Sequence, residues 1–372
     1  MKKKESRNNI VDYEPYLERR KSNVTIREVA LRAGVSTSTV GRVVGNYGYV
    51  SEQTRRKVLK AMKEIGYYPN IIARSLKTSR TQTIAYLVPS ITNPFFSRIA
   101  SSIEDLASAH QYNLILCNAG TKADKLRKIT TMLLENRVAG VIHSLPSTDA
   151  LHNLVEIFQN THIPIVAGSG SHKFTEVDMV MADDVQGARD ATRFLIELGH
   201  SHIALLAVKN STTSKLRTQG YREAFQKTGY KPDEEYIMEG PGFSEDSGYT
   251  LMKVLLGRSR PPTAVIAFND VMAVGAIRAV EEEGLSIPED ISLVGFDDTI
   301  ARLTQPRLTS VALPMEEIGR VAIRILLDRI EGKDKGEPKK VLLREKLVVR
   351  DSTARPPASS LKLSLRRGAI KR

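Results

Sequence analysis

The spacing of apolar residues changes along the chain and separates a short helical head from a long body. In residues 25–66, apolar positions recur every three or four residues, as on one face of a helix. From residue 82 onward, short apolar runs alternate with amphipathic helical segments. Such alternation is typical of parallel sheets covered by helices on both faces. We therefore expect an all-α head followed by an α/β body.

The start of the head has the signals of two short helices joined by a turn. Thr25 can cap the backbone of Glu28 while Glu28 reaches back to Thr25, which makes a capping box. Gly34 follows in a position suited to a turn with positive φ, and Ser36 can cap a second helix. A helix, a short turn containing glycine and another helix form a helix-turn-helix signature.

The second helix, GVSTSTVGRVV, is rich in β-branched residues and contains a glycine, so intrinsic propensity alone does not explain it. Three valines share a side that can pack on the first helix: Val40, Val43 and Val44. The outer side carries Thr37, Ser38, Gly41 and Arg42. Small polar groups permit close approach to a DNA groove, and Arg42 can make a bidentate contact with guanine.

A third helix is predicted from Ser51, its cap, to Gly66, its stop. Its buried stripe is expected to consist of Val58, Leu59, Met62 and Ile65. Lys60 and Lys63 fit a solvated face, whereas Thr54 and Arg55, at the helix start, are better placed for phosphate contacts.

Three blocks, TIREVALRAGVSTSTVGRVV, VSEQTRRKVLKAMKEIGYYPN and IIARSLKT, in this order and spacing, resemble the head of the lac-repressor and gal-repressor (LacI/GalR) family of bacterial transcription regulators. The resemblance implies that the second helix reads the major groove. Family members usually carry serine where this chain has Gly41 and asparagine where it has Gly45, so contacts from those side chains are not expected here. The candidate DNA-binding residues are Thr25, Ser36, Thr37, Ser38, Thr39, Arg42, Tyr49, Thr54, Arg55, Asn70, Ala73 and Leu76.

Residues 70–81 are predicted to be a hinge helix and linker. Asn70 can cap a helix through IIARSLK, which is too short to be stable alone. The resemblance implies that this helix forms only when two subunits sit on DNA, and that Leu76 then wedges into the minor groove. An ordinary contact between Leu76 and the body is the alternative.

Residues 82–350 match the family's body, which implies a two-lobed, periplasmic-binding-protein-like fold with two doubly wound parallel sheets. By this resemblance residues 82 to about 181 form the first lobe and about 182–310 the second. Residues 315–330 return to the first lobe, and residues 341–349 end near the second. The predicted strands are TIAYLV, NLILCN, AGVIHS, IPIVAG, HIALLAV, AVIAF and ISLVGF.

Ligands in open α/β sheets bind at the carboxyl ends of the strands, where this chain carries several polar residues. The resemblance implies that they bind a small effector, often a sugar or nucleobase. The candidate effector-binding residues are Phe95, Ser169, Arg217, Asn269, Asp270 and Asp297.

Some of these residues have structural alternatives. Asp270 could cap the helix after it, Asp298 could fix a loop, and Arg217, placed at a helix start, could form a surface ion pair. Ser169 stands where sugar-binding members often have aspartate, and Leu313 where the crossover usually offers glutamine. These departures weaken the case for a simple sugar and leave open a larger, less polar or absent effector.

The positive charge is concentrated at the two ends of the chain. The formal net charge is +13, yet residues 1–81 hold 18 Lys and Arg against 7 Asp and Glu, and residues 352–372 hold 6 against none. A basic head and tail around an acidic middle suit a polyanion such as nucleic acid. We expect a flexible basic arm over residues 1–24, a helix-turn-helix domain over residues 25–69, and a basic, disordered tail over residues 351–372. The tail is too short for the leucine-repeat helix that assembles some relatives into tetramers.

No residue pattern points to an enzyme, a metal site or a cofactor. His200 and His202, the close pair among seven histidines, lack carboxylate or cysteine neighbours at metal-ligand spacing. GSGSHK at residues 168–173 lacks the ending of a phosphate loop, and no GxSxG elbow is present. Cys117, the single cysteine, lies in an apolar run and is expected to be buried. Because we find neither a membrane-length apolar run nor a secretory signal, we expect a cytoplasmic protein without a membrane partner.

Together these features predict a sequence-specific transcription regulator, acting as a repressor by its resemblance. It would bind a near-palindromic double-stranded DNA operator as a homodimer, under the control of a small-molecule effector between the lobes. One alternative keeps the DNA binding but makes the signal a partner protein docked on the first lobe, as in catabolite-control relatives. Another is a solute-binding transport protein, which shares the body fold but would carry a signal peptide and no basic head.

Overall fold

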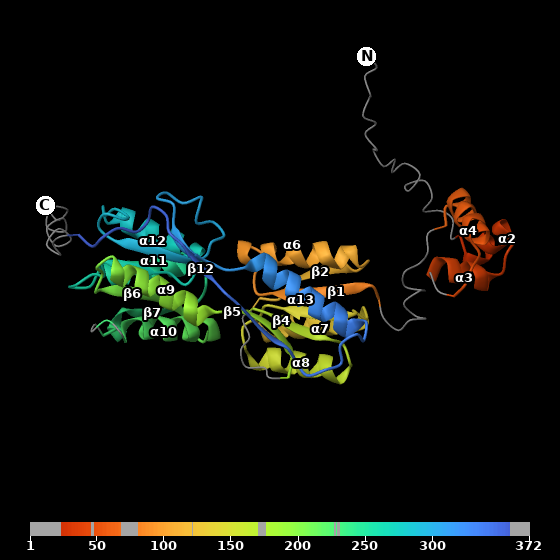
Figure 1. Cartoon of the computed structure of the whole chain (residues 1–372), viewed down its shortest axis with the longest axis horizontal. Coiled ribbons are helices and arrows are strands. Elements are labelled where there is room, and N and C mark those ends of the chain that lie inside the picture. Colours follow the sequence, from red (N-terminus) through yellow and green to blue (C-terminus); the bar gives the residue numbers. More distant parts are fainter. Residues whose placement is uncertain are drawn as a thin grey trace, which may run out of the picture. The chain divides into compact units, whose positions relative to one another are not determined.

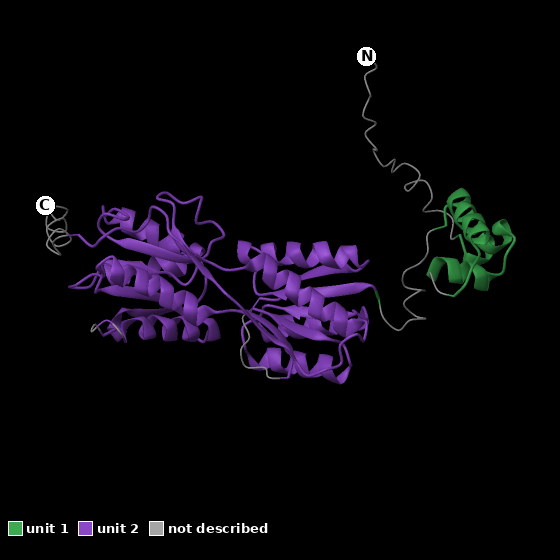
Figure 2. Cartoon of the chain, in the orientation of Figure 1, with its two compact units in different colours: residues 1–81 green, residues 82–372 purple. Residues whose placement is uncertain are grey.

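The computed structural model describes residues 24–45, 48–67, 81–120, 122–169, 176–226, 228 and 231–357. The chain divides into two compact units, residues 1–81 and residues 82–372 (Figure 2). Within the described ranges, no helix has the length and apolar character needed to cross a membrane.

The described residues of the head form the helices α2 (Ile26–Ala33), α3 (Thr37–Gly45) and α4 (Glu52–Ile65). The predicted capping box is present, with the Thr25 amide donating to Glu28 Oε2 at 2.6 Å. Gly34 ends α2 with a φ of 65°. Ser36 Oγ accepts from the Thr39 amide at 3.1 Å and so caps α3. The local signals in the sequence therefore placed these helix boundaries correctly.

The core of the head is small and consists of valines and alanines: Val29, Ala30, Val40, Val43, Val58 and Ala61. The prediction for α4 was wrong at Leu59, whose side chain is 51% exposed. Ala61 is buried instead. It lies three residues after Val58 and therefore on the same helix face, whereas Leu59 directly follows Val58 and points away from that face.

The first lobe of the body is a parallel six-stranded sheet with helices on both faces. Its strands, in the order in which they pair, are β11 (Lys340–Leu343), β5 (Asp178–Ala182), β4 (Ile165–Gly168), β3 (Gly140–His143), β1 (Thr83–Val88) and β2 (Asn113–Asn118). Helices α6 (Pro94–Ala109) and α13 (Met315–Ile330) cover one face, and α7 (Ala123–Glu135) and α8 (Asp149–Asn160) cover the other (Figure 1).

The second lobe repeats this plan with a second six-stranded sheet. Its strands pair in the order β12 (Lys346–Val348), β10 (Thr309–Ala312), β9 (Ser292–Asp297), β8 (Ala264–Ile266), β6 (Ile203–Val208) and β7 (Ile237–Gly240), and only β12 runs antiparallel to its neighbour. Helices α9 (Asp184–Glu197) and α10 (Thr212–Phe225) pack together on one face, and α11 (Glu245–Leu256) and α12 (Asp270–Glu282) on the other. A short 3-10 helix, η2 (Glu234–Tyr236), precedes β7.

The predicted fold class is confirmed, since the body holds two mostly parallel sheets and all the predicted strands are present. Helix α13 returns to the first lobe as expected, and residues 341–349 contribute one strand to each sheet. We missed β5, β7, β10, β11 and β12, which are short segments that mix apolar with charged or small polar residues. The chain therefore passes between the lobes after β5, after β10 and after β11.

The body continues beyond residue 350, so the tail begins later than we predicted. Ser352 is fully buried, and its Oγ donates to the Leu293 carbonyl at 2.5 Å and accepts from the Thr309 amide at 2.8 Å. The Ala354 carbonyl lies 2.9 Å from His200 Nε2. These bonds anchor residues 351–357 to the second lobe. Residues 358–372 and residues 1–23 of the arm lie outside the described residues.

Candidate effector cavity and nucleic-acid interface

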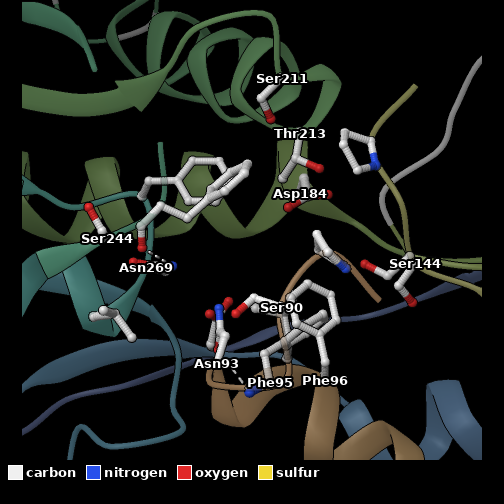
Figure 3. A pocket seen from close by; sticks show the side chains of 18 of the residues that line it. Ser90, Asn93, Phe95, Phe96, Ser144, Asp184, Ser211, Thr213, Ser244 and Asn269 are labelled. Carbon is white, nitrogen blue, oxygen red and sulfur yellow. Dashed lines mark hydrogen bonds between the residues drawn. The ribbon is translucent and has the colours of Figure 1, made fainter. Parts of the chain in front are cut away.

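A cavity of about 400 Å³ lies between the two lobes, where the carboxyl ends of strands from both sheets face each other (Figure 3). Of the predicted effector-binding residues, those that line it are Phe95, Ser169, Arg217, Asn269 and Asp297. Residues far apart in the sequence meet here because parallel strands end at the same edge of a sheet. This arrangement was the basis of the prediction.

The first-lobe wall of the cavity is uncharged. Asn93 Oδ1 accepts from the Phe95 amide at 2.9 Å and caps α6, which fixes the start of this helix at the cavity. The Phe95 and Phe96 rings meet edge to face with centroids 5.1 Å apart (Figure 3). The Ser90 and Ser169 hydroxyls also line the wall. It therefore offers aromatic surface and neutral hydrogen-bonding groups.

The second-lobe wall carries a buried ion pair. Arg217 is only 3% exposed, and its Nε donates to Asp184 Oδ1 at 2.8 Å. Its Nη1 donates to the Phe268 carbonyl. The guanidinium also stacks over two rings, with Cζ 3.9 Å from the Phe296 centroid and 4.6 Å from that of Phe268. The alternative of a surface ion pair was wrong for Arg217, as was its placement at a helix start, because α10 begins at Thr212.

Burial shifts the pKa values of the ionisable side chains in the second-lobe wall. It raises the pKa of Asp297 to about 7, although Arg217 lowers it, and Asp270 and Asp184 add to the rise. Burial disfavours the charge on Arg217, but Asp184, Asp297 and Glu345 together raise its pKa above the usual value. Arg217 is therefore charged at every physiological pH, whereas Asp297 binds a proton near neutrality.

Asp270 departs from the prediction, because it does not line the cavity. It is fully buried, with Oδ2 accepting from the Thr299 amide and Oδ1 from Ser310 Oγ, both at 2.7 Å. Asn269, not Asp270, caps α12, with its Oδ1 2.8 Å from the Met272 amide. Asp270 supports the loop that follows Asp297, and burial raises its pKa to about 6.

Asp298 has the structural role given as its alternative. Arg350 Nη2 donates to Asp298 Oδ2 at 2.9 Å, which ties the loop after β9 to the end of the body.

Sequence reasoning missed several cavity residues, above all Asp184. It follows β5 as the second of two aspartates, so recognition of DMVMA as a strand would have marked it as a strand-end carboxylate. The aromatic residues Phe243 and Phe268 were also missed. Their rings lie 5.0 Å apart between centroids, a contact that no short-range pattern predicts.

The head carries its candidate DNA contacts on exposed surface. Thr37, Ser38 and Arg42 are exposed on α3, and Tyr49 is 90% exposed. The remaining described candidates have local structural roles or are partly covered. The hydroxyls of Thr25, Ser36, Thr39 and Thr54 are engaged in helix caps, and Arg55 is half-buried. Asn70, Ala73 and Leu76 lie outside the described residues.

The described part of the chain contains no group of three or more His, Cys, Asp or Glu side chains that could hold a metal ion. His200 is instead buried in the second lobe, where its Nδ1 lies 2.9 Å from Thr263 Oγ1. Cys117 is buried, as expected.

Both units of the chain match known protein families. Residues 25–70 match the model of the bacterial regulatory proteins of the lacI family, and residues 192–353 match that of a periplasmic binding protein-like domain. The chain is 39% identical to the HTH-type transcriptional regulator DegA of Bacillus subtilis (strain 168), over 89% of this chain and 98% of DegA. It belongs to the lacI family.

Solved structures of relatives have a fold similar to that of this chain. A lac repressor dimer bound to operator and the anti-inducer ONPF has a TM-score of 0.79 and 30% identity, covering 90% of this chain and 100% of that one. A complex of the transcriptional regulator CelR with cellobiose has a TM-score of 0.68 and 33% identity, covering 88% and 99%. This lacI-family chain is thus a DNA-binding transcription regulator with a ligand-binding body, and its relatives are regulators rather than enzymes.

Proposed function

We propose that this regulator is a homodimeric repressor that binds a near-palindromic operator through its helix-turn-helix heads and changes its DNA affinity when a small molecule occupies the interlobe cavity. The observation that carries the proposal is that one chain contains both exposed side chains on α3 that can enter a DNA groove and a cavity lined by residues of both lobes. A ligand that contacts both walls favours one lobe arrangement over another, which is the requirement for an effector.

The chemistry of the cavity favours a neutral effector with hydroxyl groups and an apolar face. Among the described residues that line it, the cation Arg217 is already bonded to Asp184, Glu245 accepts from Arg278 Nη1 at 2.6 Å, and Asp297 is a further acidic group. An anionic effector such as a sugar phosphate would therefore have to compete with Asp184 for the guanidinium of Arg217. The aromatic rings of Phe95 and Phe243 can cover the apolar face of a sugar or a nucleobase. That the CelR relative is described as a cellobiose complex supports this class.

The alternative is control by a partner protein docked on the first lobe. A cavity that lies between the lobes and is lined by buried polar groups favours a small molecule instead.

The proposal is tested on the purified full-length chain in two steps. A thermal-shift panel of neutral mono- and disaccharides, nucleosides and purine bases is run beside the phosphorylated forms of the same compounds. We expect at least one neutral compound to raise the melting temperature, and its phosphorylated form to have no effect. That compound should then change the affinity for an operator duplex in fluorescence anisotropy.

Two controls decide the outcome. Asp297→Asn should weaken the response to the compound, whereas Glu197→Gln, at an exposed position, should leave it unchanged. Stabilisation by phosphorylated compounds alone, or binding that leaves operator affinity unaltered, would contradict the proposal. Sedimentation of the free chain tests the dimer, and a monomer at micromolar concentration would count against it.

A further inference from the structure

Glu345 lies in the connection between β11 and β12, where the chain passes from the first lobe to the second. Its carboxylate is buried against Gly187 of α9, so close that a methyl group on Gly187 would overlap with Oε2 and would lie 3.0 Å from Val311. Both carboxylate oxygens are shielded from solvent and have no hydrogen-bond partner among the described residues. A buried carboxylate without a donor is costly and therefore calls for an explanation.

The groups that face Glu345 make this position more costly. Asp183 and Asp184 start α9, Asp297 ends β9, and Arg217 on α10 is the single cation among them. Arg217 already donates to Asp184 and to the Phe268 carbonyl. Gly187, against which the carboxylate packs, carries no charge, and neither does Val311, the other side chain close to Gly187. An ionised Glu345 would thus add another negative charge beside these aspartates, while the guanidinium of Arg217 is already hydrogen-bonded to other groups.

The same surroundings keep a proton on Glu345. Burial raises the pKa of its carboxyl well above the usual value, and Asp184, Asp297 and Asp183 add to the rise while Arg217 opposes it. A neutral carboxyl can remain packed against Gly187, whereas an ionised one is drawn to water or competes with Asp184 for Arg217.

We propose that Glu345 is a positioning residue of the effector site: its neutral carboxyl holds the β11–β12 crossover against α9, behind the Arg217–Asp184 pair, and its ionisation releases the crossover and reorients the lobes. Arg217 and Asp184 line the cavity, so the proton on Glu345 links pH to the shape of the effector site. The consequence for DNA rests on the proposed function, while the lobe movement does not.

The first test is stability against pH. Because the folded state raises the pKa of Glu345, it binds this proton more tightly than the unfolded state does. The corresponding stability is complete below the unfolded pKa and is lost as pH rises. The E345Q variant should therefore melt several degrees above the wild type at pH 8.5, with the gap closing at pH 5. The matched control E197Q, at an exposed carboxylate on α9, should show no such gap. A gap that is independent of pH would overturn the proposal.

The second test uses the contact with Gly187. Gly187→Ala should expel the carboxyl and lower the melting temperature, and adding Glu345→Ala should restore most of the loss. Strictly additive losses in the double variant would show that Glu345 does not occupy this space, and would overturn the proposal.

The third test follows the lobes themselves. Spin labels on S108C and R193C, at exposed positions of the first and second lobe in a C117S background, report the interlobe distance by double electron–electron resonance. We expect the distance distribution to shift between pH 6 and pH 8.5 in this background and to stay fixed when E345Q is added. A shift that persists in E345Q, or no shift in either protein, would contradict the inference. If the lobes move but operator affinity does not follow, Glu345 keeps its role and the proposed function fails.

Discussion

Two arginines with proposed functional roles, one in each unit, lie in opposite environments. Arg42 is exposed on α3, on a head whose buried side chains, among the described residues, are valines and alanines. Arg217 is 3% exposed and is bonded to Asp184 inside the body. In the head, function lies on side chains that folding does not use, whereas in the body the functional groups are also part of the packed interior. The same substitution should therefore change binding in one unit and folding in the other.

The largest effect is expected at Arg217. Arg217→Met removes the cation that is bonded to Asp184 and lowers the pKa of Asp297, and it should destabilise the body by about 3–5 kcal/mol at pH 8. Because burial raises the pKa of Asp297 to about 7, this carboxylate can take up a proton at pH 5.5, and the loss should shrink there. Denaturant unfolding of the body at both pH values measures it. Arg42→Met is the matched control, and an equal loss for both variants would erase the contrast between the two arginines.

The core of the head should be the next most sensitive. Val58 is fully buried, so Val58→Ser should cost about 2–3 kcal/mol through a cavity and a buried hydroxyl. Since so small a core has little stability to spare, operator binding should fall sharply while the melting of the body is unchanged. The neighbouring Leu59→Ser, at a position that is 51% exposed, provides the control. Equal losses of operator binding in both variants would argue against the described packing of α4.

Arg42→Ala should affect binding alone. If Arg42 reads guanine, the variant should lose about 1–3 kcal/mol of operator affinity and tolerate substitution at one base position. Anisotropy titrations on the operator and on single-base variants measure both. A uniform loss on every duplex would instead assign Arg42 to a phosphate contact.

The smallest effect is expected at Gly41, on the same helix. Gly41→Ser supplies the residue usual in the family and improves helix propensity by roughly 0.5 kcal/mol, so operator binding should tighten about twofold. Weaker binding would mean that the backbone of α3 needs the absence of a side chain to approach DNA.

The head could be predicted from the sequence almost in full because its signals are local. The caps at Thr25, Ser36 and Ser51 each depend on residues three positions apart. The prediction that Leu59 is buried failed, because which of two adjacent apolar residues faces the core depends on the direction of the neighbouring helices. The sequence pattern leaves that direction open.

The body was predictable in its fold and only partly in its site. Strand-end residues such as Ser169 and Asp297 were placed correctly, since the topology alone brings them together. Asp184 was missed together with its strand, and Asp270 was misplaced because adjacent strand-end residues can face either the cavity or the loop behind it. Glu345 carried no sequence signal, because only the fold brings it beside Gly187.

The central claim is that this chain reads a specific DNA sequence through its head. Selection from a library of random duplexes with the purified full-length protein, followed by sequencing, tests it most directly. We predict enrichment of a near-palindromic site whose affinity falls steeply with salt yet exceeds that of scrambled duplex by at least about a thousandfold. A library that shows no enriched sequence, with equal binding to every duplex, would contradict the account.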